Sequence, residues 1–206
     1  MTSALTHSFY ELSPDAVLDA LDAVGLRGDG RLLALNSYEN RVYQVGIEDA
    51  APVVAKFYRP QRWSDEAILE EHAFVAELHA AEIPVVPPLA LGGTTLHTYQ
   101  HYRFAVFPRQ GGRAPELEAA GTLEWLGRFM GRIHMVGAVR PFAQRPALDL
   151  QTFGEQPRDW LLAQGVIPDE LLESWSAISR LALDGVKRCY DRAGDVRLIR
   201  LHGDCH

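Results

Sequence analysis

The stretch VVAKFYRPQRWSDEAILEEHAF, residues 53–74, decides the fold of this chain. Residues 53–58 show the alternation of a β-strand, which places Lys56 on the same face as Val54 and Tyr58. The strand otherwise has the composition of a core element, so the ammonium group of Lys56 needs a partner. The alternative is a lysine that extends along an edge strand until its ammonium group reaches water.

The helix that follows this strand offers a partner. It starts at Ser64 and runs to about Ala81. Residues four, seven and eleven positions after Ala67 share one helical face with it, so Glu71 lies in an apolar stripe, whereas Glu70 faces water. The inward stripe comprises Ala67, Glu71, Phe74 and Leu78, and the outward glutamates are Glu66, Glu70 and Glu77.

An ion pair between Lys56 and Glu71, 15 residues apart (71 − 56), is therefore expected. Phosphoryl-transfer enzymes of the kinase type use such a pair to hold the phosphates of a nucleotide. The alternative is a purely structural salt bridge, which would add little stability because desolvation offsets most of its attraction. A functional pair is favoured on that ground.

A polar loop precedes the strand of Lys56. Strands over residues 31–35 and 41–45 flank the sequence NSYEN, which begins at Asn36 and contains no glycine. Asn36 and Asn40 belong to a residue type that tolerates positive φ angles, and the hydroxyl group of Ser37 is able to donate a hydrogen bond to a phosphate oxygen. The loop is a candidate phosphate site, with an ordinary polar hairpin loop as the alternative.

The chain changes in character after a hairpin over residues 95–107. A glycine-rich segment follows, and backbone groups around Phe107 and Arg109 are expected to bind an adenine base there. A sheet-rich half joined through such a hinge to a helical half is typical of proteins that bind ligands between two lobes. The later elements are predicted as helices near 115–136 and 168–194 and a last strand over 196–201.

The sequence HGDCH, residues 202–206, follows that last strand and carries side chains able to do chemistry. Asp204 is a candidate general base, since a carboxylate close to a hydroxyl group accepts its proton in phosphoryl transfer. Gly203 allows a sharp turn, and His202 is able to brace the loop with a hydrogen bond. A metal cluster of His202, Asp204, Cys205 and His206 is disfavoured, because such close ligands do not readily close a tetrahedron. No metal ligand is assigned.

The composition narrows the possible function classes. Of 206 residues, 47% are hydrophobic and 23% are charged, and the formal net charge is −7. That charge argues against the broad basic surface that nucleic acids require. Two cysteines are too few for a disulfide framework, so a reducing compartment is expected. Neither a secretory signal nor an apolar stretch of membrane-spanning length is expected from the pattern.

Six segments of the sequence resemble the stress response kinase A family of bacterial serine/threonine kinases. They are LNSYENRVYQ, VVAKFYRP, ILEEHAF, PVVPPLA, FAVFP and LHGDCH, and the resemblance covers essentially the whole chain. It implies an α+β, protein-kinase-like two-lobed fold of the aminoglycoside-phosphotransferase type. A nucleotide-binding N-lobe with a sheet and a helix is expected over residues 1–109. The hinge and the first part of an incomplete helical C-lobe are expected over 110–206.

The resemblance also implies the chemistry of the site. ATP is the expected phosphoryl donor, magnesium (Mg2+) the cofactor, and a protein serine or threonine, including one of the kinase's own, the acceptor. Asp204 is the implied proton acceptor, Ser37 the ATP-loop residue, and Lys56 with Glu71 the phosphate-holding pair. A cytoplasmic monomer is expected, linked to envelope and oxidative stress, with no nucleic-acid or membrane partner.

The catalytic motif of this family, HGDxHxxN, ends on an asparagine that would fall at position 209 (204 + 5) and bind magnesium. The chain is therefore expected to be the first part of a longer kinase, cut within its catalytic loop and inactive by itself. Two other functions stay open at this point. One is a kinase for a small molecule such as an aminoglycoside, choline or homoserine, and the other is a non-catalytic ATP-binding regulator.

Overall fold

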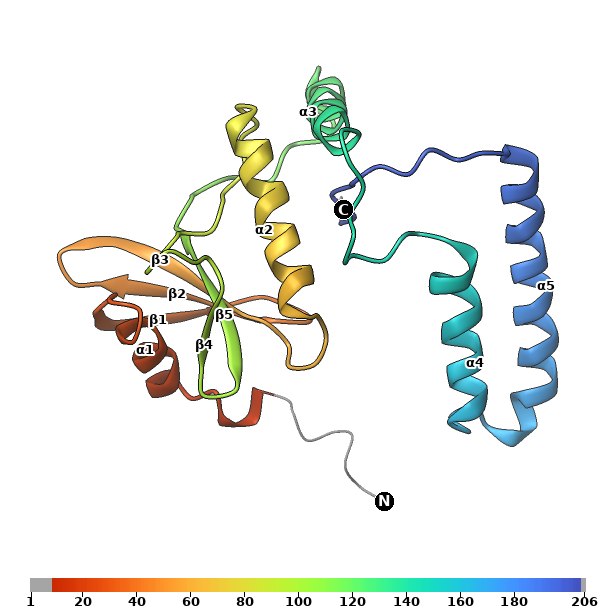
Figure 1. Ribbon diagram of the computed structural model, residues 1–206, viewed down its shortest axis with the longest axis horizontal. Helices are drawn as coiled ribbons and strands as arrows, with labels where there is room; N and C mark the ends of the chain where they lie inside the picture. Colours follow the sequence, from red (N-terminus) through yellow and green to blue (C-terminus); the bar gives the residue numbers. More distant parts are fainter. Residues whose placement is uncertain (1–8, 205–206) are drawn as a thin grey trace. The chain divides into compact units, whose positions relative to one another are not determined.

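The computed structural model describes residues 9–204, which fall into two compact units (Figure 1). The first unit contains residues 9–137 together with 201–204 and includes the whole β-sheet. The second unit contains residues 138–200, and its regular elements are helical.

A five-stranded antiparallel sheet forms the centre of the first unit. Its strands have the spatial order β1-β2-β3-β5-β4, so β3 is an inner strand with neighbours on both sides. Lys56 on β3 pairs with Val42 on β2 and with Ala105 on β5. The first-half strands and the hairpin predicted from the sequence are confirmed. The bounds are β1 Gly28–Leu35, β2 Arg41–Ile47, β3 Ala50–Phe57, β4 His97–Tyr99 and β5 Tyr102–Pro108.

One face of the sheet packs against α1 (Pro14–Asp22). The side chain of Ser13 caps this helix by accepting a hydrogen bond from the backbone N–H of Ala16 at 3.2 Å, and Pro14 fits the first helical position. Every second strand residue faces α1, which produces the main hydrophobic core. The buried side chains of this core are Leu12, Ala16, Val17, Ala20, Leu21, Val45, Ile47, Val53, Ala55, Phe57, Tyr102, Phe104 and Val106.

The opposite face of the sheet, which carries Lys56, packs against α2 (Asp65–Ala80). Ser64 caps α2 as predicted, because its hydroxyl oxygen accepts a hydrogen bond from the backbone N–H of Ala67 at 3.2 Å. A smaller core joins the helix to the sheet here, and α1 and α2 therefore lie on opposite faces (Figure 1). Its buried members are Tyr58, Ile68 and Ala105, with Trp63, Leu96 and Phe107 packed around them.

A third helix of the first unit, α3 (Thr122–Gly137), begins later than predicted. The expected start near residue 115 is wrong, because Gly121 adopts a φ of 83°, which a right-handed helix does not accommodate. The guanidinium group of Arg132 in α3 donates hydrogen bonds to the carbonyl oxygens of Ala81 and Glu82, at 3.1 and 2.9 Å. By its contacts α3 belongs with the sheet.

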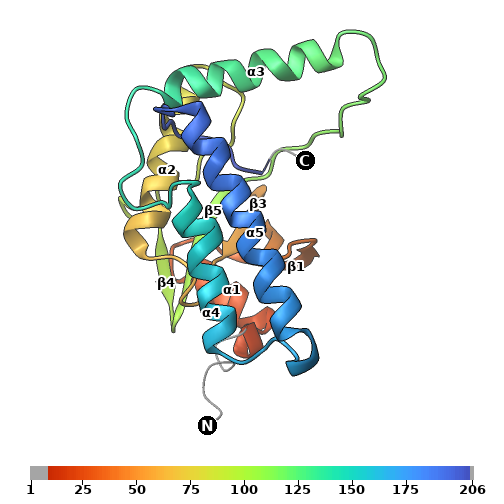
Figure 2. The ribbon, with the colours of Figure 1, turned by 90° about the vertical axis from the view of Figure 1, so that its right-hand side faces the viewer.

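The second unit consists of a π-helical turn, η2 (Gln151–Glu155), followed by α4 (Gln156–Ala163) and α5 (Asp169–Ala193). The two helices run antiparallel and side by side in both Figures 1 and 2. Arg158 of α4 holds them together by donating a hydrogen bond to the hydroxyl oxygen of Ser179 at 3.0 Å. The helix predicted over 168–194 is confirmed, whereas the helical segment over 151–163 was not predicted.

The strand predicted over residues 196–201 is wrong, since the structure assigns no regular element there. Strand formation requires a hydrogen-bonded neighbour, and the strands of residues 9–204 all belong to the sheet of the first unit. Among the same described residues, no helix is both long and apolar enough to cross a membrane. The lobe boundary predicted between residues 109 and 110 stays a prediction.

Candidate functional site

The predicted ion pair between strand and helix is present. The ammonium nitrogen of Lys56 lies 3.4 Å from Oε1 of Glu71, and the two side chains are 26% and 32% exposed. The pair thus joins β3 to α2 at a position that solvent and a ligand can reach. A partly exposed pair contributes little to stability, so a purely structural role does not account for it.

The phase predicted for α2 is confirmed on its inner side only. Ala67, Phe74 and Leu78 are buried, and Glu71 is half-buried as the prediction requires. The prediction that Glu70 and Glu77 face water is wrong, because both side chains are half-buried too, whereas Glu66 is exposed as predicted. Because α2 contacts α3 as well as packing against the sheet, a larger part of its circumference is covered than a single apolar stripe suggests.

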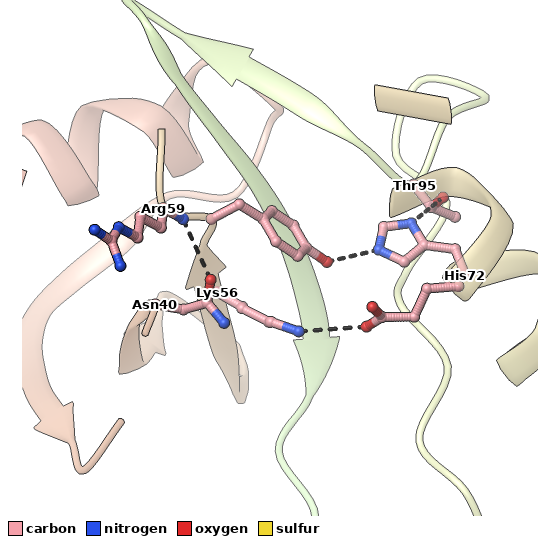
Figure 3. Close-up of polar contacts among 7 residues, drawn as sticks. Asn40, Lys56, Arg59, His72 and Thr95 are labelled. Atoms are coloured by element: carbon pink, nitrogen blue, oxygen red, sulfur yellow. Dashed lines mark hydrogen bonds and ion pairs between the residues drawn. The ribbon is translucent and has the colours of Figure 1, made fainter. Parts of the chain in front are cut away.

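A buried histidine next to Glu71 was missed in the sequence. His72 is only 4% exposed, and both of its ring nitrogens have partners. Nε2 lies 2.7 Å from the hydroxyl oxygen of Tyr58, and Nδ1 lies 2.8 Å from the hydroxyl oxygen of Thr95 (Figure 3). The one signal in the sequence is its spacing four residues after Ile68, which is fully buried.

The surroundings of His72 keep its imidazole neutral. Burial, then the positive charge of Lys56 and then His97, lower the pKa of His72 from 6.5 to about 4. At neutral pH one ring nitrogen therefore carries a proton and donates, while the other accepts. The aromatic ring of Tyr58 also lies beneath the ammonium group of Lys56, 4.8 Å from its centroid.

The candidate phosphate loop is closed by an internal hydrogen bond and attached to the segment after β3 through Asn40. The hydroxyl group of Ser37 donates to the carbonyl oxygen of Asn40 at 2.8 Å. Oδ1 of Asn40 accepts from the backbone N–H of Arg59 at 3.2 Å (Figure 3). Asn36 and Ser37 are exposed. Neither Asn36 nor Asn40 adopts a positive φ, so the tolerance of asparagine for that region is not used here. The role of Ser37 toward a phosphate stays a prediction.

The loop makes a further contact with the segment that follows β3. Nε of Arg62 lies 2.6 Å from Oε1 of Glu39, while the guanidinium group of Arg62 stacks on the ring of Trp63 at 4.5 Å. Two contacts, made by Asn40 and Glu39, therefore connect the loop over residues 36–40 to the segment that follows β3. This arrangement attaches the loop that carries the exposed hydroxyl group of Ser37 to the segment that follows the strand of Lys56.

An apolar surface continues across the sheet from Lys56. Directly paired residues of antiparallel strands share a face, and the pairings extend this face from Lys56 and Val54 into β2, β1 and β5. Leu33 is 57% exposed and Leu35 is 37% exposed on it. The residues of this apolar face are Leu33, Leu35, Val42, Val54 and Phe107.

The residues predicted to bind adenine border the same face. Phe107 is half-buried and pairs with Val54, and its ring meets that of His72 edge-on at 6.4 Å between centroids. Nε of Arg109 donates to Oε1 of Gln44 at 3.2 Å. A surface hollow lined in part by Leu33, Gln44, Gly46 and Pro52 lies on the sheet beside them. The backbone contacts to a base that were predicted here stay a prediction.

Asp204, the predicted proton acceptor, is exposed. Its backbone N–H donates to Nδ1 of His202 at 3.2 Å, which is the brace expected of that histidine. Cys205 and His206 lie outside the described residues. Within residues 9–204, no group of three histidine, cysteine, aspartate or glutamate side chains is arranged to hold a metal ion.

Together these residues provide a cation on β3, an apolar surface that extends over the neighbouring strands, and an exposed hydroxyl group in the loop between β1 and β2. Lys56 can neutralise charge on an anionic group, and Glu71 keeps the ammonium group in place. The face that includes Leu33 and Leu35 can cover a flat apolar ring. Such a combination suits a nucleotide, whose base is flat and whose phosphates are anionic.

Comparison with curated proteins identifies close relatives. The chain is 42% identical over 199 residues to stress response kinase A of Salmonella choleraesuis (strain SC-B67), covering 97% of this chain and 60% of that protein. It is equally similar to the protein called serine/threonine protein kinase RdoA of Salmonella typhimurium, and 41% identical to stress response kinase A of Escherichia coli (strain K12), with the same coverage. The chain thus spans about 60% of the length of these relatives.

Solved structures with the same fold are more distant in sequence. A microcompartment-associated aminopropanol kinase matches with a TM-score of 0.65 and 22% identity, over 88% of this chain and 59% of that one. Spectinomycin phosphotransferase APH(9)-Ia, in complex with ADP and spectinomycin, matches with a TM-score of 0.63 and 14% identity, over 93% and 63%. The predicted α+β, kinase-like fold of the aminoglycoside-phosphotransferase type is confirmed.

A model of the phosphotransferase enzyme family, known as APH, matches residues 31–206. The matched region includes the loop of Ser37, both members of the Lys56–Glu71 pair and Asp204. By sequence as well as by fold, the chain belongs to the phosphotransferase enzyme family.

Proposed function

We propose that the protein containing this chain transfers the γ-phosphoryl group of ATP to the hydroxyl group of a protein serine or threonine. The observation that carries the proposal is the Lys56–Glu71 pair, 3.4 Å apart, at one end of an exposed apolar face. In phosphoryl-transfer enzymes a strand lysine held by a helix glutamate contacts the phosphates of the nucleotide. The names of the relatives at 41–42% identity support the same activity.

ATP supplies the phosphoryl group, and the chain's own residues bind and orient it. The adenine packs against the face that includes Leu33, Leu35 and Phe107, with the segment around Arg109 bordering it. The phosphates extend toward Lys56, which neutralises part of their charge. The loop of Asn36, Ser37 and Asn40 covers them, and the hydroxyl group of Ser37 exchanges its internal hydrogen bond for one to a phosphate oxygen.

Phosphoryl transfer also requires a metal ion, which is expected to be magnesium. Among residues 9–204, no group of three histidine, cysteine, aspartate or glutamate side chains is arranged to hold a metal ion. The use of magnesium is proposed for the whole protein on the general requirement of phosphoryl transfer for a metal bridging the phosphates.

Asp204 is proposed as the residue that accepts the proton of the acceptor hydroxyl group. A small-molecule acceptor is the second candidate, because the structural neighbours include kinases for aminopropanol and spectinomycin. Those neighbours are at most 22% identical, whereas the relatives at 42% carry the names of stress response and serine/threonine kinases. The protein acceptor is therefore preferred, in a cytoplasmic monomer that phosphorylates partner proteins or itself.

The acceptor is tested with the full-length protein and γ-labelled ATP in the presence of magnesium. Protein acceptors, including the kinase alone, are compared with spectinomycin, choline, homoserine and aminopropanol. We expect label on serine or threonine residues of protein and none on the small molecules. A Lys56→Met variant serves as the background control, because it keeps a long apolar side chain and removes the charge. Label on a small molecule only would replace the proposed acceptor, and binding of ATP without any transfer would indicate a regulator.

A further inference from the structure

The contact between β3 and α2 contains a second link beside the ion pair. Lys56 lies on β3, Tyr58 follows the last residue of that strand, and Glu71 and His72 are adjacent on α2. The ammonium group of Lys56 lies 3.4 Å from Glu71, and the hydroxyl group of Tyr58 lies 2.7 Å from Nε2 of His72. Two residues at the end of β3 thus contact two adjacent residues of α2.

The two links differ in environment. The side chains of Lys56 and Glu71 are 26% and 32% exposed, so water screens their attraction. Tyr58 is 3% exposed and His72 is 4% exposed, so their hydrogen bond is short and shielded from water. The buried hydrogen bond between Tyr58 and His72 is therefore the more rigid contact, while the exposed pair of Lys56 and Glu71 carries the charges.

Adjacent helix residues point about 100° apart around the helix axis. Fixing the direction of His72 therefore fixes the direction of Glu71. Thr95, on the segment before β4, holds the other ring nitrogen of His72 at 2.8 Å and prevents the ring from turning (Figure 3). A slip of α2 that broke the bond to Tyr58 would also turn Glu71 away from Lys56.

We infer that His72 is a positioning residue of the nucleotide site, whose hydrogen bonds to Tyr58 and Thr95 set the rotation of α2 and so hold Glu71 against Lys56. The inference rests on the proposed function, since it concerns the same lysine and glutamate. It assigns no contact between His72 and the nucleotide. Tyr58 makes two contacts, because its hydroxyl group binds His72 and its ring lies 4.8 Å from the ammonium group of Lys56.

Tyr58→Phe is the cleanest test, because it removes one hydroxyl group and keeps the ring under Lys56. We expect the dissociation constant of the full-length protein for magnesium-ATP, measured by titration calorimetry, to rise about 3- to 10-fold, the equivalent of one hydrogen bond. Thr95→Val should have a similar effect, and Thr95→Ser, which keeps a hydroxyl group, should restore wild-type affinity. Tyr99→Phe is the matched control, since it removes a hydroxyl group that binds Asp19 at 3.3 Å elsewhere on the sheet.

A double-mutant cycle separates positioning from general stability. If His72 acts through Glu71, Tyr58→Phe should have no further effect on ATP affinity once Glu71→Gln has removed the ion pair. An unchanged affinity in Tyr58→Phe, or an equal loss in both backgrounds, would overturn the inference. Lys56→Met and Glu71→Gln variants that bind ATP as the wild type does would overturn the proposed function itself, and the inference with it.

Discussion

The ammonium nitrogen of Lys56 lies 3.4 Å from Oε1 of Glu71, in a contact that joins an inner strand of the sheet to the helix packed on it. The pair is too exposed to be explained by stability alone, because partly solvated ion pairs contribute roughly 0–1 kcal/mol. We therefore expect the pair to hold the ammonium group of Lys56 in a position where it can act on a ligand. Substitution of either residue tests this expectation.

Lys56→Ala in the full-length protein should lower the turnover of ATP about 100-fold, which corresponds to about 2.7 kcal/mol of transition-state stabilisation. Glu71→Ala should act in the same direction, because the lysine then loses its anchor. Glu70→Ala is the matched control one position away and should have little effect on turnover. Steady-state kinetics with ATP as the varied substrate make the comparison. If Glu70→Ala is as damaging as Glu71→Ala, the assignment of Glu71 is wrong.

Ser37→Ala should raise the KM for ATP by about 2- to 10-fold, the range expected for the loss of one hydrogen bond. The hydroxyl group of Ser37 is exposed and donates to the carbonyl oxygen of Asn40, so its removal costs little core packing. The matched control is Ser174→Ala on α5, where an exposed serine also donates to a backbone carbonyl oxygen, at 3.1 Å. A KM that stays at the wild-type value would leave Ser37 as a plain turn residue.

The pH dependence of folding should reveal His72. Its pKa is lowered from 6.5 to about 4 by burial, Lys56 and His97, while the hydroxyl group of Tyr58 contacts the same ring from the residue after β3. Well above pH 6.5 the imidazole is neutral in both the folded and the unfolded chain and adds no pH dependence. As the pH falls toward 4 the unfolded chain binds a proton that the folded chain does not, so stability decreases with falling pH.

The loss from this one group should approach at most about 3 kcal/mol between pH 7 and pH 4. Carboxylates titrate in the same range, so the measurement is the difference between the wild type and His72→Gln in denaturant unfolding. That difference should shrink as the pH is lowered, because the variant lacks the titrating ring. His79→Gln, an exposed histidine on the same helix, is the control and should follow the wild type. A constant difference across the range would show that the pKa of His72 is not lowered by folding.

The Lys56–Glu71 contact could be predicted because strand alternation and helix periodicity each fix a face from local sequence. The contacts of His72 could not, because this residue lies outside the apolar stripe that helix periodicity defines, and Thr95 lies in a segment without regular structure, which local sequence does not place. The start of α3 depended on the conformation of Gly121, which apolar spacing does not report. The strand expected over 196–201 had the right composition, but a strand also needs a neighbour.

Asp204→Asn should separate binding from chemistry in the full-length protein. The carboxylate is proposed to act on the acceptor hydroxyl group and not on the nucleotide, so phosphoryl transfer should fall about 10²- to 10⁴-fold, the usual contribution of a general base. The dissociation constant for ATP should stay within about twofold of the wild type, since no interaction with the nucleotide is removed. Asp195→Asn, at another exposed aspartate, is the control and should leave both quantities unchanged. Transfer at the wild-type rate in Asp204→Asn would remove this residue from the mechanism, and a parallel loss of ATP affinity would place it in the nucleotide site instead.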